Sequence, residues 1–404
     1  MLFYVVVLPI VRPLDTRILG IHVFATDLIF ASALLFWLVS AVLKRPDLDR
    51  RYLVIVGTFF LALTASALFS TEPRKSWFKL TGVFYLIAVS MVIADLVRDT
   101  RFLKHLVYAW TVGAGITIFG TAVGLLGFYL GYDSMATNFF LFHAGSLPPG
   151  NYPRVMAFFE NPNMTASYTN VAVMMILGGG RVGWLSTRTS FAIVALLFGS
   201  TVFMISPGIG GMILSLGIWY YFTENSKSRH LVLAGCILIG FLTLLSTAIS
   251  PITRETENTV TIPIIEKRIE PSVRFIVWKD SVERGLEYPI LGRGTGTDAA
   301  NVRFQALSGQ RQFLSDAHQA WLNIFGQAGL IGLTAFITLC WYLFSICRFR
   351  SDPVSERTTM LVACSCGFVG AFLFQNLFGS FEDARQLWVL IGMLVGLSSV
   401  SWES

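Results

Sequence analysis

The residues best suited to chemistry lie in a polar segment between long apolar stretches, Ser250–Ala317. Within it, Ser272 is a favoured N-cap, and apolar residues at 273, 276 and 277 predict a membrane-surface helix with Trp278 at the interface. Arg274 then lies in the first turn, where the helix dipole disfavours a cation unless an anion shares the site. Backbone N–H groups and a guanidinium that converge form an anion site. The alternative is that Arg274 pairs with Glu270 or is solvated.

The same segment carries a glycine-rich turn, Pro289–Gly296, that includes Arg293 and Gly294. It is not a nucleotide-binding loop, because no Lys-Ser/Thr pair follows it. One interpretation is a tight turn that needs glycine backbone angles, and the other is a nest of N–H groups beside Arg293 that binds an anion. Arg268 is a further basic residue of this segment.

His318 is predicted to open a long apolar helix, with Ser315 or Asp316 as its cap. A histidine at a membrane helix end either packs at the interface or acts as a base. Its place at the end of the arginine-bearing segment favours the base.

A second polar segment, Gly131–Asn163, leads into another apolar stretch through Arg154 and Asn161-Pro162-Asn163. The Asn-Pro step fixes an extended path, and Asn163 is the predicted helix cap. Arg154 is placed to face the same cavity as the longer segment.

The elements that hold these segments are transmembrane helices. Of the 404 residues, 54% are hydrophobic and only 13% charged, and the mean hydropathy is +0.65. Most apolar blocks approach the roughly 17–25 residues that a spanning helix needs. Counting Met1–Val11 as a tilted first span, we predict an all-α, polytopic integral membrane protein of about twelve transmembrane helices. Residues 1–249 and 318–404 hold the helices of one membrane domain.

Basic residues cluster in alternate connections between the apolar blocks, for example at Lys44–Arg51 and Arg348–Arg357. The positive-inside rule places these connections in the cytoplasm. The segments 131–163 and 250–317 then lie outside it, and the longer one is predicted to carry short helices. The net charge of +6 is therefore no sign of nucleic-acid binding.

Several of these motifs occur in an order that resembles the O-antigen ligase and polymerase superfamily. The series is Arg154, Glu160-Asn161-Pro162-Asn163, Arg274-Phe-Ile-Val-Trp278, Pro289-x-x-Gly292-x-Gly294-x-Gly296, His318-Gln-Ala-Trp-Leu322 and Gly329-Leu-Ile-Gly332. The resemblance covers about Arg154 to Gly332.

The resemblance implies a metal-independent, inverting glycosyltransferase of the membrane (GT-C-like) type, without cofactor, in the bacterial inner membrane. Such enzymes transfer a glycan from undecaprenyl diphosphate to an acceptor hydroxyl on the periplasmic side. The acceptor is lipid A–core oligosaccharide in a ligase and another lipid-linked repeat unit in a polymerase. The family arginine maps onto Arg274 and the family histidine onto His318.

One departure concerns a short outer turn, where many members have Ser-Arg-Gly and this chain has Ser206-Pro207-Gly208. Arg154, Arg268 and Arg293 are the candidates to replace that arginine at the diphosphate, with Asn161, Asn163 and Gly294 in support. An arginine cluster can neutralise a diphosphate leaving group without a metal.

We favour a ligase over an O-antigen or exopolysaccharide polymerase because the chain is compact, with one dominant outer segment. A polysaccharide transporter or flippase is a less favoured alternative. It would show broken spans in paired halves and acids at mid-membrane, whereas only Asp27 and Asp95 lie in or near apolar blocks.

The topology predicts that Ser250–Ala317 is reached from outside the cell. A cysteine introduced at Ser308 should react with a membrane-impermeant thiol reagent in intact cells. Labelling that occurs only after lysis would place the segment in the cytoplasm and contradict the topology.

Overall fold

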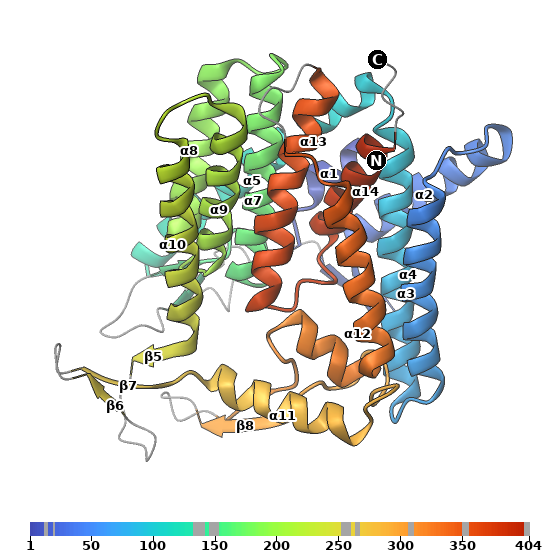
Figure 1. Cartoon of the computed structure of the whole chain (residues 1–404), viewed down its shortest axis with the longest axis vertical. Helices are drawn as coiled ribbons and strands as arrows, with labels where there is room; N and C mark the ends of the chain where they lie inside the picture. The colour runs from blue at the N-terminus through green and yellow to red at the C-terminus, as the bar shows by residue number, and fades with distance from the viewer. Residues whose placement is uncertain are drawn as a thin grey trace.

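The computed structural model describes residues 1–11, 15–18, 21–131, 142–144, 153–251, 260–262, 267–305, 311–349 and 355–399. These residues are mostly helical, and long helices run side by side along the molecule (Figure 1). Parts of both polar segments, 131–163 and 250–317, lie outside the described residues.

Seven of the described helices are long and apolar enough to cross a membrane, and three more are apolar but shorter. The seven are α2 (Ala25–Leu43), α3 (Arg50–Leu68), α4 (Pro73–Leu96), α5 (Thr100–Tyr129), α10 (Arg229–Ala248), α12 (Ala320–Ile346), and α13 (Glu356–Gly367) continued by η1 (Phe368–Phe374) and η2 (Gln375–Leu377). The shorter three are α8 (Thr187–Phe203), α9 (Gly208–Thr223) and α14 (Arg385–Ser398). The predicted helical, multi-pass membrane protein is confirmed, while the count of about twelve spans stays a prediction.

The first apolar stretch is not a span. Its helix α1 (Leu2–Val7) has six residues, or about 9 Å of rise, which is too short to cross a bilayer. Pro9 follows closely and disfavours helix in the residue before it. Tyr4 and Val5 are buried, and α1 packs against α5, so the stretch belongs to the core. The prediction of a tilted first span at Met1–Val11 is therefore wrong.

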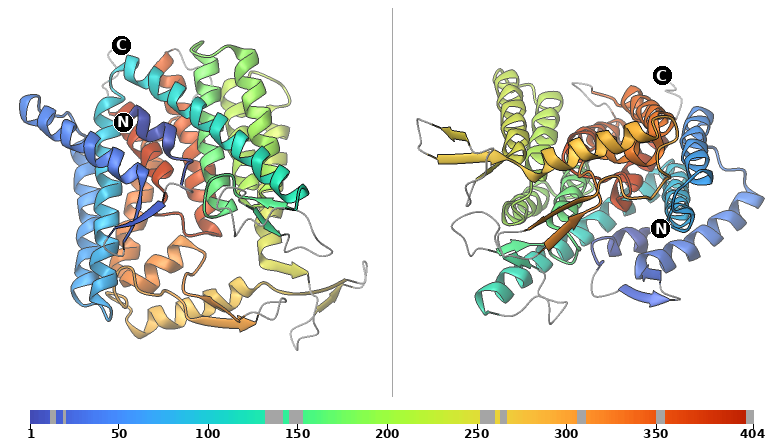
Figure 2. Two further views of the ribbon diagram at one scale, coloured as in Figure 1. Left: turned by 180° about the vertical axis from the view of Figure 1, so that it is seen from behind. Right: turned by 90° about the horizontal axis from the view of Figure 1, so that it is seen from below.

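Short antiparallel strands lie in the connections. They are β1 (Asp15–Ile18) with β2 (Ile21–Phe24), β3 (Phe142–Ala144) with β4 (Pro153–Val155), β5 (Ile249–Pro251) and β6 (Val260–Ile262) on either side of β7 (Lys267–Pro271), and β8 (Val302–Gln305) with β9 (Arg311–Leu314). The longer polar segment thus carries one described helix, α11 (Val273–Glu287), together with two small sheets. Figure 2 shows α11 crossing the ends of the long helices from a second direction.

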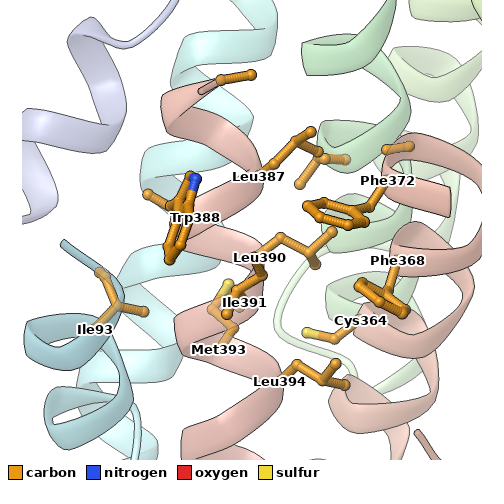
Figure 3. Close-up of a cluster of buried hydrophobic side chains, with 14 of the residues drawn as sticks. Ile93, Cys364, Phe368, Phe372, Leu387, Trp388, Leu390, Ile391, Met393 and Leu394 are labelled. Carbon is orange, nitrogen blue, oxygen red and sulfur yellow. The ribbon is translucent and has the colours of Figure 1, made fainter. Parts of the chain in front are cut away.

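The core is densest around α14, which is buried along nearly its whole length (Figure 3). Leu387, Leu390 and Leu394 lie close to Phe368 and Phe372 of η1. On the side facing α4, an added Cβ at Gly392 or Gly396 would come within 2.5 or 2.3 Å of a backbone oxygen of α4. Two glycines four residues apart let the backbones of membrane helices approach closely. This contact fixes the second half of α14 beside the last turns of α4.

Helix α12 is interrupted at Gly329, where φ is 62° and ψ is −161°. The glycine-rich turn Pro289–Gly296 fills the interruption. The carbonyl of Pro289 accepts from the N–H of Leu330 at 2.8 Å, and that of Ile290 accepts from the N–H of Ile331 at 3.2 Å. The N–H of Gly294 donates to the carbonyl of Gln327 at 2.9 Å. A break in a membrane helix is tolerated where protein groups satisfy the freed backbone atoms. The turn therefore completes the broken helix.

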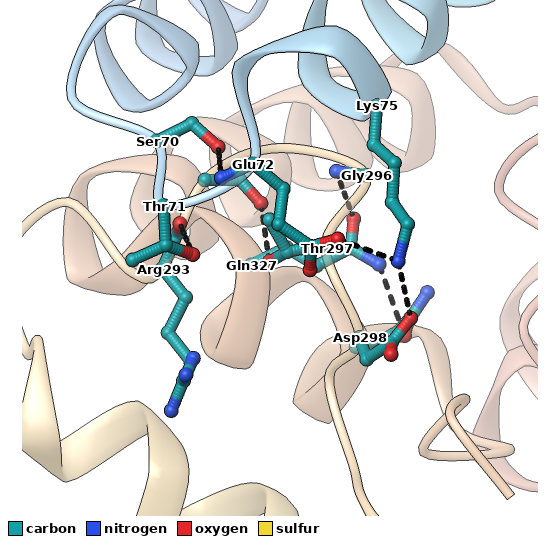
Figure 4. Close-up of polar contacts among 11 residues, drawn as sticks. Ser70, Thr71, Glu72, Lys75, Arg293, Gly296, Thr297, Asp298 and Gln327 are labelled. Carbon is teal, nitrogen blue, oxygen red and sulfur yellow. Dashed lines mark hydrogen bonds and ion pairs between the residues drawn. The ribbon is translucent and has the colours of Figure 1, made fainter.

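The same turn also joins the α3–α4 connection (Figure 4). The carbonyl of Arg293 accepts from the N–H of Thr71 at 2.9 Å and from its hydroxyl at 3.0 Å. Asp298 pairs with Lys75 at 3.4 Å. The end of α3, the start of α4 and the interruption in α12 are thereby held in one unit.

Gly329→Ala should destabilise the protein by at least about 2 kcal/mol, because alanine disfavours this φ and overpacks the site. The added Cβ would lie 2.4 Å from the carbonyl oxygen of Ile290. The measurement is the thermal midpoint of the purified protein in detergent. Gly57→Ala is the matched control, since a Cβ there meets nothing within 4 Å. Equal midpoints for the two variants would contradict the packing argument.

Candidate active site

Helix α11 begins as the sequence predicted. Ser272 is the N-cap, and its hydroxyl accepts from the N–H of Arg274. The protein covers only part of the apolar face, because Val277 is buried whereas Ile276 is 57% exposed. Ser281 and Gly285 continue the buried face, and an added Cβ at Gly285 would collide with Phe325 of α12. Helix packing against α12 therefore sets which way Arg274 points.

Two hydrogen-bond donors on α11 are buried without a partner among the described residues. They are Nη1 of Arg274 and Nε1 of Trp278. Residues four apart lie on one face of a helix, so the two donors are neighbours. Leaving a buried donor unpaired costs about 1–3 kcal/mol, and more for a charged group. A ligand that offers only acceptor atoms would satisfy both.

Arg154 of β4 lies against the α8–α9 turn. Its Nε donates to the carbonyl of Met204 at 3.2 Å, and its Nη2 donates to Oδ1 of Asn163 at 3.2 Å. The hydroxyl of Ser206 donates to the same Oδ1 at 2.7 Å. The guanidinium thus lies at the Ser206-Pro207-Gly208 turn.

Asn163 is available for these bonds because it is not the helix cap. Asn161 caps α7 (Pro162–Arg181), and its side chain accepts from the N–H of Asn163 at 2.8 Å. The predicted cap was therefore two residues too late, since Pro162 occupies the first helical position.

The two arginines lie close enough to influence each other. Burial lowers the pKa of Arg274, and the positive charge of Arg154 lowers it further. Two like charges that approach in a partly buried place favour an anion between them.

His318 joins the same cluster. Burial lowers the pKa of its imidazole, and the charge of Arg274 lowers it too, while Asp316 opposes both by raising it. The imidazole Nδ1 lies 3.7 Å from Oδ1 of Asp316, and the side chain is 42% exposed. The group is therefore accessible and biased toward its neutral, proton-accepting form.

The local structure at His318 corrects the predicted helix start. The N-cap of α12 is Gln319, without a side-chain bond, and not Ser315 or Asp316. The carboxylate of Asp316 instead accepts from the N–H of His318 and from the hydroxyl of Ser380 at 2.6 Å. His318 thus precedes the helix and does not open it.

Strain marks this region. Among the described residues, three that are not glycine have positive φ: Ala157 at 51°, Ile205 at 46° and His318 at 50°. Such angles cost about 1–3 kcal/mol each and gather at functional sites. Ala157 follows the strand of Arg154, and Ile205 lies between Met204 and Ser206, so all three belong to this cluster.

A family model described as O-antigen ligase matches residues 166–337. Residues 166–337 are therefore similar to the O-antigen ligase family. This match confirms the resemblance drawn from the motifs, and it includes both Arg274 and His318. No curated protein matches the chain.

Other residues predicted for the site lie elsewhere. Arg293 pairs with Glu287 at 2.8 Å, at the end of α11 that is about 20 Å from Arg274 by helix rise. The N–H groups of Gly292, Arg293, Gly294 and Gly296 all donate to protein acceptors, so Gly294 belongs to a packed turn and not to an anion nest. Arg268 lies in β7, and its side chain is outside the described part of the chain.

The segment before α14, which follows the matched residues 166–337, contributes polar groups that were not predicted from the sequence. Ser380 reaches Asp316, and Glu382 accepts from Asn323 of α12 at 2.7 Å. Burial raises the pKa of Glu382. The signal was present, because these polar residues stand between two apolar blocks. Among the described residues of the whole chain, no three His, Cys, Asp or Glu side chains are grouped to hold a metal.

The charges around His318 predict how its pKa responds to substitution. Diethyl pyrocarbonate acylates neutral imidazole, so acylation of His318 should reach half its maximum below pH 6.5, the ordinary value. Asp316→Asn removes the influence that raises the pKa and should shift this midpoint down. Arg274→Gln removes one that lowers it and should shift the midpoint up. Mass spectrometry of the His318 peptide measures both, and opposite shifts would contradict the assignment.

Proposed function

We propose that the chain is an O-antigen ligase that transfers a glycan from undecaprenyl diphosphate to a hydroxyl of lipid A–core oligosaccharide. The observation that carries the proposal is the convergence of Arg154, Arg274 and His318 from three separate parts of the chain. Two guanidinium groups, of which Arg274 has a buried donor without a partner among the described residues, and a nearby base are suited to transfer from a diphosphate.

Arg274 and Trp278 bind the donor diphosphate in this proposal. Diphosphate oxygens accept hydrogen bonds and carry negative charge, so they satisfy the buried Nη1 and Nε1 donors together. Arg154 takes the place of the arginine that is absent at Pro207, because it is already anchored to that turn through Met204 and Asn163. Asn161 supports it by capping α7 and leaving Asn163 free to accept.

His318 acts as the general base. It accepts the proton of the acceptor hydroxyl while that oxygen attacks the anomeric carbon and the sugar–phosphate bond breaks. The bonding electrons leave with the diphosphate, whose growing charge the two guanidinium groups neutralise. Attack from the face opposite the leaving group inverts the anomeric configuration. The mechanism uses neither metal nor cofactor.

The proposed enzyme is one membrane domain with about eleven spans, since Met1–Val11 is not one of them. It comprises residues 1–249 with the outer segment 131–163, the periplasmic segment 250–317, and the C-terminal spans in 318–404. It lies in the bacterial inner membrane with its site facing the periplasm. The basic connections and the position of α11 across the helix ends support this arrangement.

The test is transfer of a glycan from undecaprenyl diphosphate to purified lipid A–core by the reconstituted protein. His318→Gln should lose about 10²–10⁴-fold in turnover, because glutamine keeps hydrogen bonding but lacks basicity. Arg274→Lys should also lose glycan transfer, since an ammonium group cannot replace the planar guanidinium that binds two oxygens at once. Arg293→Lys is the matched control and should remain active, because its side chain pairs with Glu287 away from the cluster.

Near-normal turnover of His318→Gln would remove the base assignment. Activity lost on EDTA treatment and restored by magnesium would contradict the metal-free mechanism. A wild-type protein that elongates a lipid-linked repeat unit but leaves lipid A–core unmodified would be a polymerase and not a ligase.

A further inference from the structure

A groove of about 350 Å³ lies on the side of α4, outside the cluster around His318. It is bounded by the outer half of α4, the glycine-rich turn and the segment before α14. Its lining includes Lys75, Phe78, Lys79, Gly82, Tyr85 and Arg385. None of the residues assigned to donor binding or to the base lines it.

The charged groups of the groove are already paired. Lys79 pairs with Asp383, Arg385 with Asp27 at 2.7 Å, and Lys75 with Glu72 at 2.8 Å and Asp298 at 3.4 Å. A diphosphate would have to displace these carboxylates. A sugar would not, because each hydroxyl both donates and accepts and so matches a surface that offers cationic donors beside anionic acceptors.

The groove runs from the start of α4 into the span, with apolar residues along the helix and with Arg385, paired with Asp27, over the Tyr85 ring at 5.8 Å. Lys75 lies in the first turn of α4, and Leu86 lies about 16 Å further along the helix. Phe78 is 59% exposed there, and α4 is a candidate membrane span. A molecule that fills the groove therefore carries a polar headgroup toward the helix end and an apolar chain along the span.

The groove is connected to the His318 cluster by one short stretch of chain. Ser380 bonds Asp316, which in turn accepts from the N–H of His318, and Asp383 pairs with Lys79 in the groove. Three residues span at most about 10 Å. A headgroup at Lys79 is therefore close to the proposed base.

We propose that this groove binds the acceptor substrate, as a glycolipid whose sugar headgroup contacts Lys79 and Asp383 and whose lipid chain lies along α4. The inference rests on the proposed glycan transfer and adds to it a separate place for the second substrate. The donor diphosphate binds at Arg274 and Trp278, whose N–H groups are unpaired. The acceptor binds in the groove, where the charged side chains are already paired with one another.

The test uses a direct binding measurement on the full chain in phosphatidylcholine nanodiscs. A photoreactive alkyl maltoside serves as the glycolipid probe, and mass spectrometry locates its adducts. Adducts should form on the Lys75–Leu86 stretch of α4 and should be reduced by lipid A–core. Phosphatidylglycerol and undecaprenyl phosphate should reduce them far less.

Gly82→Leu should block the groove without disturbing the fold, because a Cβ at Gly82 meets nothing within 4 Å. It should lower labelling by at least about tenfold, since even one methylene of misfit in an apolar pocket has an effect of this order. Gly115→Leu in α5 is the matched control, with equally open space around its Cβ, and should label like the wild type.

Equal competition by phosphatidylglycerol would make the groove an ordinary lipid site and overturn the proposal. Absence of adducts on α4, or unchanged labelling of Gly82→Leu, would overturn it as well. These outcomes differ from failure of the proposed function, in which the wild-type protein transfers no glycan whatever its labelling pattern.

Discussion

The arrangement of this protein depends on the break in α12 at Gly329 and on the turn that completes it. In an unbroken helix, the turns before Gly329 would continue along the axis of the rest of α12, and His318, which precedes them, would lie elsewhere. The break frees backbone groups that water cannot reach within a membrane, and Pro289–Gly296 supplies their partners. Because Thr295 also bonds the carbonyl of Leu63 in α3 at 2.8 Å, the displaced helix start is fixed to the rest of the helix assembly.

Fixing that start brings together groups from distant parts of the chain. Asp316 and His318 precede α12, Arg274 lies on α11, which packs against α12, and Arg154 is anchored to the α8–α9 turn. A site of this kind gains precision from its scaffold, because each polar group has a structural partner that limits its movement. The groove beside α4 depends on the same scaffold through the packing of α14 against α4.

Hydropathy alone predicted the membrane fold, and local signals predicted Ser272 as the cap of α11 and Arg274 in its first turn. Prediction failed where a distant segment decides the outcome. The N–H groups of Arg293, Gly294 and Gly296 donate to Gly326 and Gln327, more than 30 residues further along the chain, which no local pattern reveals. Likewise, the packing of α11 against α12 at Gly285 depends on Phe325, 40 residues further along the chain, which the apolar pattern of α11 does not reveal.

The positive φ angles at Ala157, Ile205 and His318 have a consequence for protein engineering. Glycine adopts such angles at little cost, so replacing Ala157 or Ile205 by glycine would relieve strain that the native side chains impose. The same replacement would widen the range of conformations open to the chain beside Arg154 and the α8–α9 turn. A more stable protein obtained in this way would hold its guanidinium less rigidly, so these two positions are where stability and activity trade against each other.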